Sequence, residues 1–385
     1  MATNQVEAGA GIAELLDVYG APDACAIELL CTRHPANAIA FTLVEPDLSS
    51  RDLTYGELAA ASARFAAGLA AHGIAAGDRV ATLMGKSAEL VVALLGIWRL
   101  GAVHVPLFTA FAPQAIALRI TGNGTTAIVV DPDQRPKLDD IATDGLTIIA
   151  AGAAGAGDDL LAADAPDVAP PAVGGDGTLV EIFTSGTTGA PKGVPVPVRA
   201  LAGMHAYLTY GLDVTDADVY WNAADPGWAY GLYYAIIAPL AAGRRSLLLH
   251  AGFSPERTWA VLSTFGVTNL AAAPTVYRAL RGADQAVPRD LVLRHCSSAG
   301  EPLTPEVIGW AEATLGIPVR DHYGQTETGM TVANGWHPEV VGPVKPGSMG
   351  RALPGFRVEV LSRDADEITP RASRAASRST CTTAR

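Results

Sequence analysis

The stretch from Leu293 to Tyr323 reads LRHCSSAGEPLTPEVIGWAEATLGIPVRDHY, and it contains the repeating unit that decides the fold. Its first six residues and its last seven are short runs typical of buried strands. Between them, TPEVIGWAEATLG predicts a helix with Thr304 as its N-terminal cap and Pro305 in the first turn, where proline is tolerated. The stretch therefore predicts a strand–helix–strand unit.

The same alternation runs through the rest of the chain. In the second half we predict strands at residues 178–183, 218–223, 245–250 and 267–273, with helices at 199–210, 232–240, 255–266 and 274–282. In the first half, Thr54 and Glu57 form a capping box that opens a helix to about His72. A strand at 79–84, a helix at 87–100 and a strand at 102–107 follow. Such alternation implies parallel sheets covered by helices on both faces, so we expect an α/β fold of two doubly wound βα subdomains.

Composition narrows the class of function. The net charge of −12 argues against sequence-independent binding of nucleic acid, which depends on clustered basic residues. The four cysteines form no C-x-x-C pair, so we expect neither a disulfide framework nor a zinc site; they are Cys25, Cys31, Cys296 and Cys381. The first twenty residues lack the basic and apolar regions of a signal peptide. We expect a cytoplasmic protein.

The most apolar stretch, residues 90–107, is long enough to suggest a membrane span. Arg99 and His104 interrupt it, and Gly101 divides it into a helical part and a strand-like part. We therefore expect a buried helix–strand unit and no membrane span.

Glycine-rich or polar clusters come directly after several predicted strands. Because the carboxyl ends of parallel strands meet at one edge of a sheet, these loops should converge on one ligand site. The clusters are TSGTTGAPKG at 184–193, AADPGWAYG at 223–231, AAAPT at 271–275, SAGEP at 298–302 and YGQTETG at 323–329.

The first cluster is a candidate phosphate-binding loop, although it is not a Walker loop. A Walker loop needs a hydroxyl residue directly after its lysine, whereas Lys192 lies between Pro191 and Gly193. Its glycines let backbone N–H groups approach an anion, and its hydroxyls and lysine add donors. The loop therefore suits a polyphosphate.

Three motifs in this order, TSGTTGAPKG, AGEP and YGQTE, resemble those of the acyl-CoA synthetases in the adenylate-forming, AMP-binding superfamily. The resemblance covers roughly residues 40–365, most of that family's large N-terminal domain. Such enzymes use ATP and Mg²⁺ to convert a carboxylic acid into an acyl-adenylate and pyrophosphate, and then transfer the acyl group to coenzyme A. The resemblance implies the same substrates here.

The resemblance also implies roles for individual residues. Thr184, Lys192 and Glu327 would be catalytic, with Glu327 as the Mg²⁺ ligand. The β- and γ-phosphates would bind Thr184, Ser185, Gly186, Thr187, Thr188, Gly189 and Lys192. Gly300, Glu301, Pro302 and Tyr323 would lie along the adenine, and Thr326 would contact the α-phosphate. Asp321, His322, Gly324 and Gln325 would complete the nucleotide site.

The acyl pocket is expected around two of the clusters, with Trp228, Ala229, Tyr230, Gly231, Ala299 and Gly324 as its lining. Relatives specific for acetate or propionate carry a tryptophan at the position of Gly324, and medium-chain relatives carry glycine. Gly324 should therefore leave that volume open, unless Tyr230 fills it. We expect a short- to medium-chain or small aromatic acid; acetate is less favoured.

The end of the chain departs from the family pattern. Relatives continue through a small β-barrel, a ribose-binding Asp and a hinge to a C-terminal domain with a catalytic Lys. We expect a first subdomain with a surface linker at 1–170, a second carrying the ATP motifs at 171–340, a partial barrel at 341–370 and an aberrant disordered tail at 371–385. One reading frame away, GC-rich codons for the tail can encode a barrel-like continuation, which suggests a frameshift. Without that Lys, we expect weak binding, little adenylation and no thioester.

Two other functions remain open on the sequence. One is another adenylate-forming enzyme, such as an amino-acid-activating domain, although the acyl pocket shows no acidic partner for an ammonium group. The other is a catalytically dead remnant that binds nucleotide.

Overall fold

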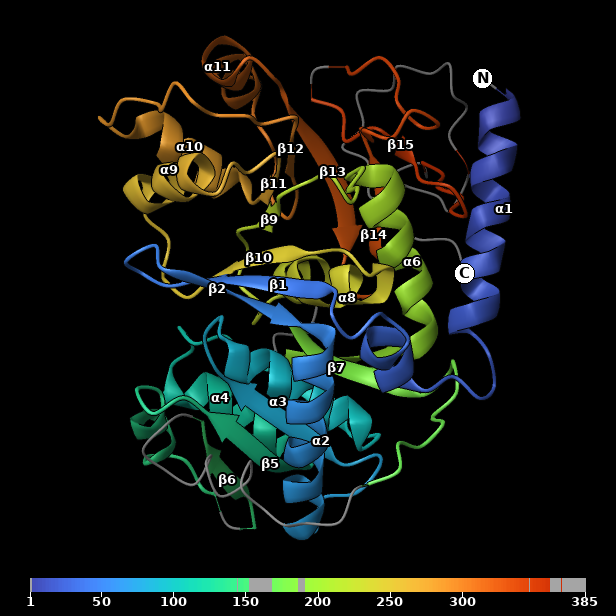
Figure 1. The fold of residues 1–385 in the computed structure, drawn as a ribbon, viewed down its shortest axis with the longest axis vertical. Helices are drawn as coiled ribbons and strands as arrows, with labels where there is room; N and C mark the ends of the chain where they lie inside the picture. The colour runs from blue at the N-terminus through green and yellow to red at the C-terminus, as the bar shows by residue number, and fades with distance from the viewer. Residues whose placement is uncertain are drawn as a thin grey trace.

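The computed structural model describes residues 2–143, 145–151, 168–185, 191–345, 347–360 and 368, and contains two sheets with helices packed around them (Figure 1). Residues 186–190 of the expected phosphate loop and the expected tail at 371–385 lie outside the described residues.

The larger sheet has nine strands, and its interior is parallel. Their order is β15-β14-β13-β12-β11-β9-β10-β1-β2, and antiparallel strands occupy both edges. The strands are β1 (Ile39–Val44), β2 (Ser50–Thr54), β9 (Tyr220–Asn222), β10 (Ser246–Leu249), β11 (Asn269–Ala272), β12 (His295–Ser298), β13 (Val319–Gln325), β14 (Gly329–Ala333) and β15 (Arg351–Ala352).

The smaller sheet has six strands in the order β6-β5-β3-β4-β7-β8, parallel except for the β7–β8 hairpin. They are β3 (Arg79–Leu83), β4 (Val103–Pro106), β5 (Thr125–Val130), β6 (Thr147–Ala150), β7 (Thr178–Ser185) and β8 (Pro191–Pro197). The α/β class and its two sheets are thus confirmed.

Helices surround both sheets, with α2 and α3 over the six-stranded sheet and α9–α11 beside β9–β12 (Figure 1). The α-helices are α1 (Ala2–Tyr19), α2 (Tyr55–Ala71), α3 (Ala88–Arg99), α4 (Pro113–Thr121), α6 (Leu201–Ala206), α7 (Ala229–Gly231), α8 (Ala238–Ala242), α9 (Pro255–Thr264), α10 (Pro274–Gly282) and α11 (Pro305–Leu315). Short 3₁₀ segments are η2 (Arg135–Leu138) and η3 (Val198–Ala200), and π-helical segments are η1 (Glu28–Thr32), η4 (Tyr207–Gly211) and η5 (Leu232–Ile237).

The predicted capping box at the start of α2 is confirmed. The Glu57 backbone N–H donates to Thr54 Oγ1 at 3.2 Å, and the Thr54 backbone N–H donates to Glu57 Oε2 at 2.7 Å. These two bonds satisfy donors that the first turn of a helix leaves unpaired.

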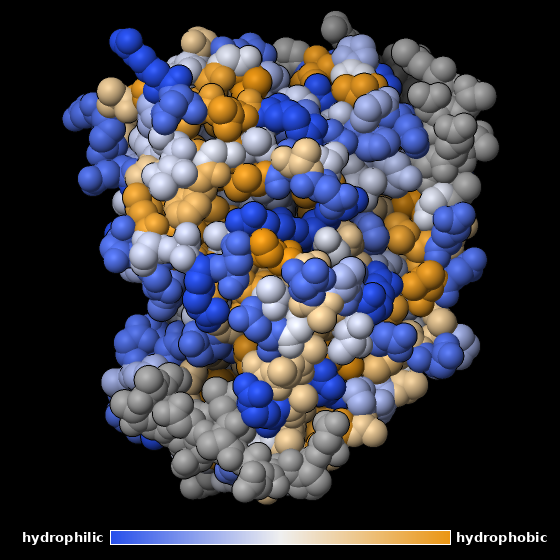
Figure 2. All heavy atoms as spheres, in the orientation of Figure 1, coloured by the Kyte–Doolittle hydropathy of each residue, from blue (hydrophilic) through white to orange (hydrophobic). Residues whose placement is uncertain are grey.

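The buried helix–strand unit is also confirmed, because α3 and β4 lie in the core. Gly96 lets α3 approach α2 closely, since a Cβ there would lie 2.6 Å from the Phe65 ring. Trp98 Nε1 donates to the Leu179 carbonyl at 3.0 Å and ties α3 to β7. Within the described residues, no helix combines the length and apolarity needed to cross a membrane. Hydrophobic residues on the face in Figure 2 occur in small groups between hydrophilic ones.

Several strands were missed by the sequence patterns. β8 contains Pro191, Pro195 and Pro197, which suggest a loop, but it is an edge strand, where proline can be tolerated. Both sheets also draw strands from either side of residue 170: β1 and β2 join the nine-stranded sheet, and β7 and β8 join the six-stranded one. The division of the chain there stays a prediction.

The surface linker that the sequence pattern predicts at residues 150–177 stays a prediction, because residues 152–167 lie outside the described part of the chain. Gly174 and Gly175 are buried, and their N–H groups donate to the carbonyls of Ala24 and Ala21. A Cβ on Gly175 would lie 2.5 Å from Gly20 Cα, so the lack of a side chain permits this packing.

Candidate functional site

A cavity of about 760 Å³ lies at the carboxyl edge of the nine-stranded sheet. β9 is the switch point of this sheet, because the chain passes from β9 to β10 on one side and then crosses to β11 on the other. We call this space the larger cavity. It is lined by Lys86, 108–110, 223–225, 228–230, Tyr233, Tyr234, 251–253, Ala273, Val276, 299–301, 324–326, Gly329 and Met330.

Four of the five predicted clusters thus contribute to one cavity. Of the expected site residues, the lining contains Trp228, Ala229, Tyr230, Ala299, Gly300, Glu301, Gly324, Gln325 and Thr326. Expected site residues that are not in that lining are Gly231, Pro302, Asp321, His322, Tyr323, Glu327, Thr184 and Lys192.

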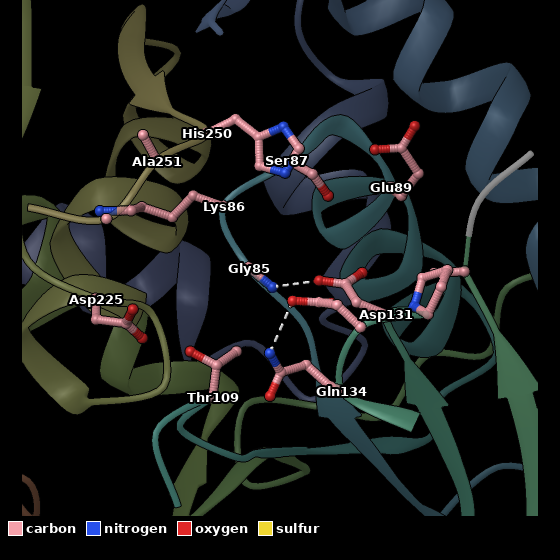
Figure 3. Close-up of a pocket in the computed structure, with 14 residues that line it drawn as sticks. Gly85, Lys86, Ser87, Glu89, Thr109, Asp131, Gln134, Asp225, His250 and Ala251 are labelled. Atoms are coloured by element: carbon pink, nitrogen blue, oxygen red, sulfur yellow. Dashed lines mark hydrogen bonds between the residues drawn. The ribbon is translucent and has the colours of Figure 1, made fainter. Parts of the chain in front are cut away.

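A second cavity, of about 610 Å³, lies at the carboxyl edge of the six-stranded sheet, where β3 is the switch point between β4 and β5. We call it the smaller cavity. It is lined by 85–87, Glu89, Thr109, 131–134, Ala151, Asp225 and 250–252. In Figure 3, Asp131 Oδ2 accepts from the Gly85 N–H at 2.6 Å, and Gln134 Nε2 donates to Asp133 Oδ2 at 3.0 Å. Sequence reasoning missed this cavity.

Aromatic side chains form one wall of the larger cavity. Trp228 is 45% exposed, and its ring centroid lies 5.6 Å from those of Phe108 and Phe111. Two phenols are engaged within the protein, because Tyr233 donates to the Thr326 carbonyl at 3.1 Å and Tyr234 accepts from the Met330 N–H at 2.8 Å. Burial raises the pKa of both phenols, so the wall is neutral at physiological pH.

Glycines let the loops around this cavity pack closely. A Cβ on Gly231 would lie 2.1 Å from the Asp225 carbonyl oxygen. Gly300 has φ +94° and nothing within 4 Å of an added Cβ, so it is required by conformation rather than by space.

The open volume expected beside Gly324 is not found in the direction of a side chain at that position. An added Cβ there would lie 2.2 Å from the Gly329 carbonyl oxygen and 2.7 Å from Met330 Cα, across the β13–β14 hairpin. The direction of that side chain is therefore occupied by backbone, because the register of the hairpin shifts between Tyr323 and Gly324.

Asp321 and His322 are buried within β13. Burial raises the pKa of Asp321 to about 6, although the N–H groups of His322 and Leu303 oppose this effect. His322 Nδ1 lies 2.7 Å from the Tyr207 hydroxyl, and burial lowers its pKa to about 3. His322 is therefore neutral at physiological pH. These two residues stay candidates for nucleotide binding.

The expected phosphate loop joins the β7–β8 hairpin. Thr184 pairs with Lys192 across the hairpin, and Ser185 pairs with Pro191. Lys192 is exposed and Thr184 is half-buried. Gly186, Thr187, Thr188 and Gly189 lie outside the described residues, so their predicted role remains a prediction.

Two acidic residues of the motifs have different surroundings. Glu301 Oε1 accepts from Thr275 Oγ1 and Glu301 Oε2 from Arg278 Nη2, both at 2.5 Å, and these bonds hold the pKa of Glu301 below its ordinary value. Glu327 is exposed, and the described residues contain no group of three or more His, Cys, Asp or Glu side chains suited to a metal. Mg²⁺ is usually held by one or two carboxylates with substrate phosphates and water, so a single exposed Glu327 fits it.

Comparisons with known proteins show the family to which the chain belongs. The family model for AMP-binding enzymes matches residues 28–374. An acetyl-coenzyme A synthetase of Bacillus subtilis is 33% identical over 312 residues, covering 76% of this chain and 53% of that protein. Its counterpart in Beijerinckia indica is 34% identical over 383 residues, covering 89% of this chain and 57% of that protein. The chain therefore spans about half the length of these curated relatives.

Solved structures show the same similarity. An acyl-CoA synthetase of Brucella canis superposes with a TM-score of 0.87 at 39% identity, covering 95% of this chain and 70% of that one. ATP-bound MatB from Rhodopseudomonas palustris superposes with a TM-score of 0.80 at 28% identity, covering 91% and 69%.

Proposed function

Because the chain belongs to the family of AMP-binding enzymes, we propose that it acts in the ATP-dependent ligation of a carboxylic acid to coenzyme A. The acid would first form an acyl-adenylate with release of pyrophosphate, and the acyl group would then pass to the thiol of coenzyme A. The acid would be of short to medium length.

One observation carries this proposal: several of the residues expected for the nucleotide and several of those expected for the acid line a single cavity at a switch point. Attack of a carboxylate on the α-phosphorus requires two anions to be held together. Gly300 and residues 324–326 lie on the same cavity as the aromatic wall around Trp228 and Tyr230. A nucleotide against the first set would place its α-phosphate near an acid against the second.

Charge neutralisation would fall to residues most of which are outside the lining of the larger cavity. Lys192 supplies an exposed ammonium and Thr184 a hydroxyl at the end of the β7–β8 hairpin. Glu327 offers hard oxygen ligands for Mg²⁺, which would neutralise phosphate charge. Thr326 lies on the cavity wall, in reach of a phosphate there.

The size of the acid would be set by the aromatic wall rather than by Gly324. Gly324 also lines the cavity, but a side chain there would meet the Gly329 backbone, whereas the aromatic wall with Trp228 and Tyr230 borders the free space. The curated relatives are named acetyl-coenzyme A synthetases, so acetate belongs in the test beside longer acids.

The test is ATP–pyrophosphate exchange by the purified chain with acetate, butyrate, hexanoate, octanoate, benzoate and a set of amino acids. We expect exchange with at least one of the non-amino acids, at the low rate that the sequence predicts for this chain, and none without acid. Exchange with amino acids alone would replace the proposal with an amino-acid-activating function. ATP binding without exchange for any acid would contradict adenylation by this chain. Formation of acyl-CoA from the best acid then tests the second step.

A further inference from the structure

The two cavities meet at a shared wall. Lys86, Thr109, Asp225, Ala251 and Gly252 line both of them. Lys86 comes from the loop after β3, and Asp225 comes from the loop after β9, so each sheet contributes one charged side chain. In Figure 3, the Lys86 side chain extends toward the side of the cavity where Asp225 and Ala251 lie.

The ammonium group of Lys86 has more N–H donors than the described residues have acceptors near it. Its Nζ lies 3.4 Å from the Ala223 carbonyl, and within the described residues that is the one acceptor at hydrogen-bonding distance. An ammonium carries three N–H donors. Burial lowers the pKa of Lys86, and the charge of Asp225 opposes this shift.

Asp225 is held in place by its own loop. Its Oδ1 accepts from the Gly227 N–H at 2.8 Å. Burial raises the pKa of Asp225, whereas that N–H and Lys86 lower it. Lys86 and Asp225 influence one another, yet no oxygen of Asp225 lies within 4.0 Å of Lys86 Nζ. Both charged groups therefore border the two cavities without forming an ion pair with each other.

The charges of Lys86 and Asp225 determine which kind of ligand group can bind between them. A hydrocarbon would desolvate both charges without pairing either, which is costly. An anion would be attracted by Lys86 but repelled by Asp225, and by Glu89, Asp131 and Asp133 in the smaller cavity. A neutral group with both a donor and an acceptor can accept from Lys86 and donate to Asp225.

We propose that Lys86 and Asp225 form a subsite for a hydroxyl or amide group of a ligand that extends from the larger cavity toward the smaller one. The subsite rests on the proposed function for its ligands. Such a group can come from two sources: a hydroxy- or amido-substituted acid, or the amide- and hydroxyl-bearing pantetheine arm of coenzyme A.

Calorimetric titration of the purified chain tests the proposal without turnover. Hexanoate, 6-hydroxyhexanoate and adipate form a matched series for the acid, and pantetheine against 1-hexanethiol tests the second source. We expect the hydroxylated acid, pantetheine or both to bind about tenfold more tightly than the matched alkyl ligand, the size of one good hydrogen bond to a charged group. Which ligand shows the preference identifies the source.

The variants are Lys86→Met, which removes the ammonium, and Asp225→Asn, which keeps an oxygen for the Gly227 N–H. Each should reduce the preference to twofold or less, whereas Lys345→Met, an exposed lysine outside both cavities, should leave it intact. Equal binding of matched ligands by the unmodified chain, or adipate binding most tightly, would overturn the subsite. ATP is titrated into the unmodified chain in parallel. If the chain binds ATP but shows no preference for a hydroxyl or amide group, the subsite alone is rejected. If the chain does not bind ATP, the proposed function is rejected.

Discussion

The two sheets place cavities by the same topological rule but equip them with different chemistry. At the carboxyl edge of the nine-stranded sheet, glycines, aromatic rings and engaged phenols surround the larger cavity. At the edge of the six-stranded sheet, Glu89, Asp131 and Asp133 give the smaller cavity an acidic lining. The strand order therefore sets where a ligand can bind, and the residues just after the strands set which ligand it is.

The largest expected effect concerns the reaction at the larger cavity. Replacing Lys192 with Met should slow ATP–pyrophosphate exchange about 10²–10³-fold, because the hairpin expected to bind the phosphates loses its cationic donor to the developing charge. Asp131→Asn, in the smaller cavity, should change the rate less than about threefold. Equal losses in both variants would contradict the assignment of adenylation to the larger cavity.

The loop of the larger cavity should be far less tolerant of an added methyl group than the wall shared by both cavities. Gly231→Ala places a Cβ 2.1 Å from the Asp225 carbonyl oxygen, whereas an added Cβ on Gly252 has nothing within 4 Å. We expect Gly231→Ala to lower the free energy of unfolding by about 2–4 kcal/mol and Gly252→Ala by less than about 0.5 kcal/mol. Urea denaturation measures both, and similar values would refute the close packing of the 225–231 loop.

Stability should depend on pH through Asp321. Its folded pKa of about 6 lies above the ordinary value of 3.8, so the folded chain binds more protons than the unfolded chain between these values. The stability present below about pH 4 is lost as the pH rises through about 6. Asp321→Asn should therefore raise the free energy of unfolding by about 1–3 kcal/mol at pH 7.5 and have no stabilising effect at pH 4. Thermal unfolding at both pH values measures this difference. An equal gain in stability at pH 4 and pH 7.5 would contradict the raised pKa of Asp321 in the folded chain.

The smallest expected effects concern the N-terminal caps of two helices, α2 over the six-stranded sheet and α11 beside the nine-stranded sheet (Figure 1). Thr54 caps α2 with a hydrogen bond from the Glu57 N–H, whereas Thr304 precedes α11 without a side-chain cap bond. Thr54→Ala should lower the free energy of unfolding by about 1 kcal/mol and Thr304→Ala by clearly less. Denaturation curves that show equal losses would mean that Thr304 stabilises α11 by another route.

The sequence predicted the repeating core of both sheets but not their edges. The β11–β12–β13 run and α2–α3 follow plain strand and helix patterns, and their bounds agree with the expected ones within a few residues. β8 was missed because its prolines suggest a loop, and only its edge position makes them acceptable.

The larger cavity was predicted by asking which clusters follow strands, and four of them do line it. The same question, asked of the first half, would have found GKS after β3 and DPDQ after β5, which line the smaller cavity. The surroundings of Gly324 could not be predicted, because they depend on the register of a hairpin whose second strand was not recognised.

Each sheet contains one hairpin from the other half of the chain, β1–β2 in the nine-stranded sheet and β7–β8 in the six-stranded sheet. This arrangement has a consequence for how the chain folds during synthesis. Phe41 in β1 pairs with Ser246 in β10, and His104 in β4 pairs with Val180 in β7. During synthesis, the first hairpin must wait until β10 has been made before it gains its parallel neighbour, and β4 must wait for β7. Neither half of the chain can complete its own sheet, so fragments cut in the region between them should assemble together or not at all.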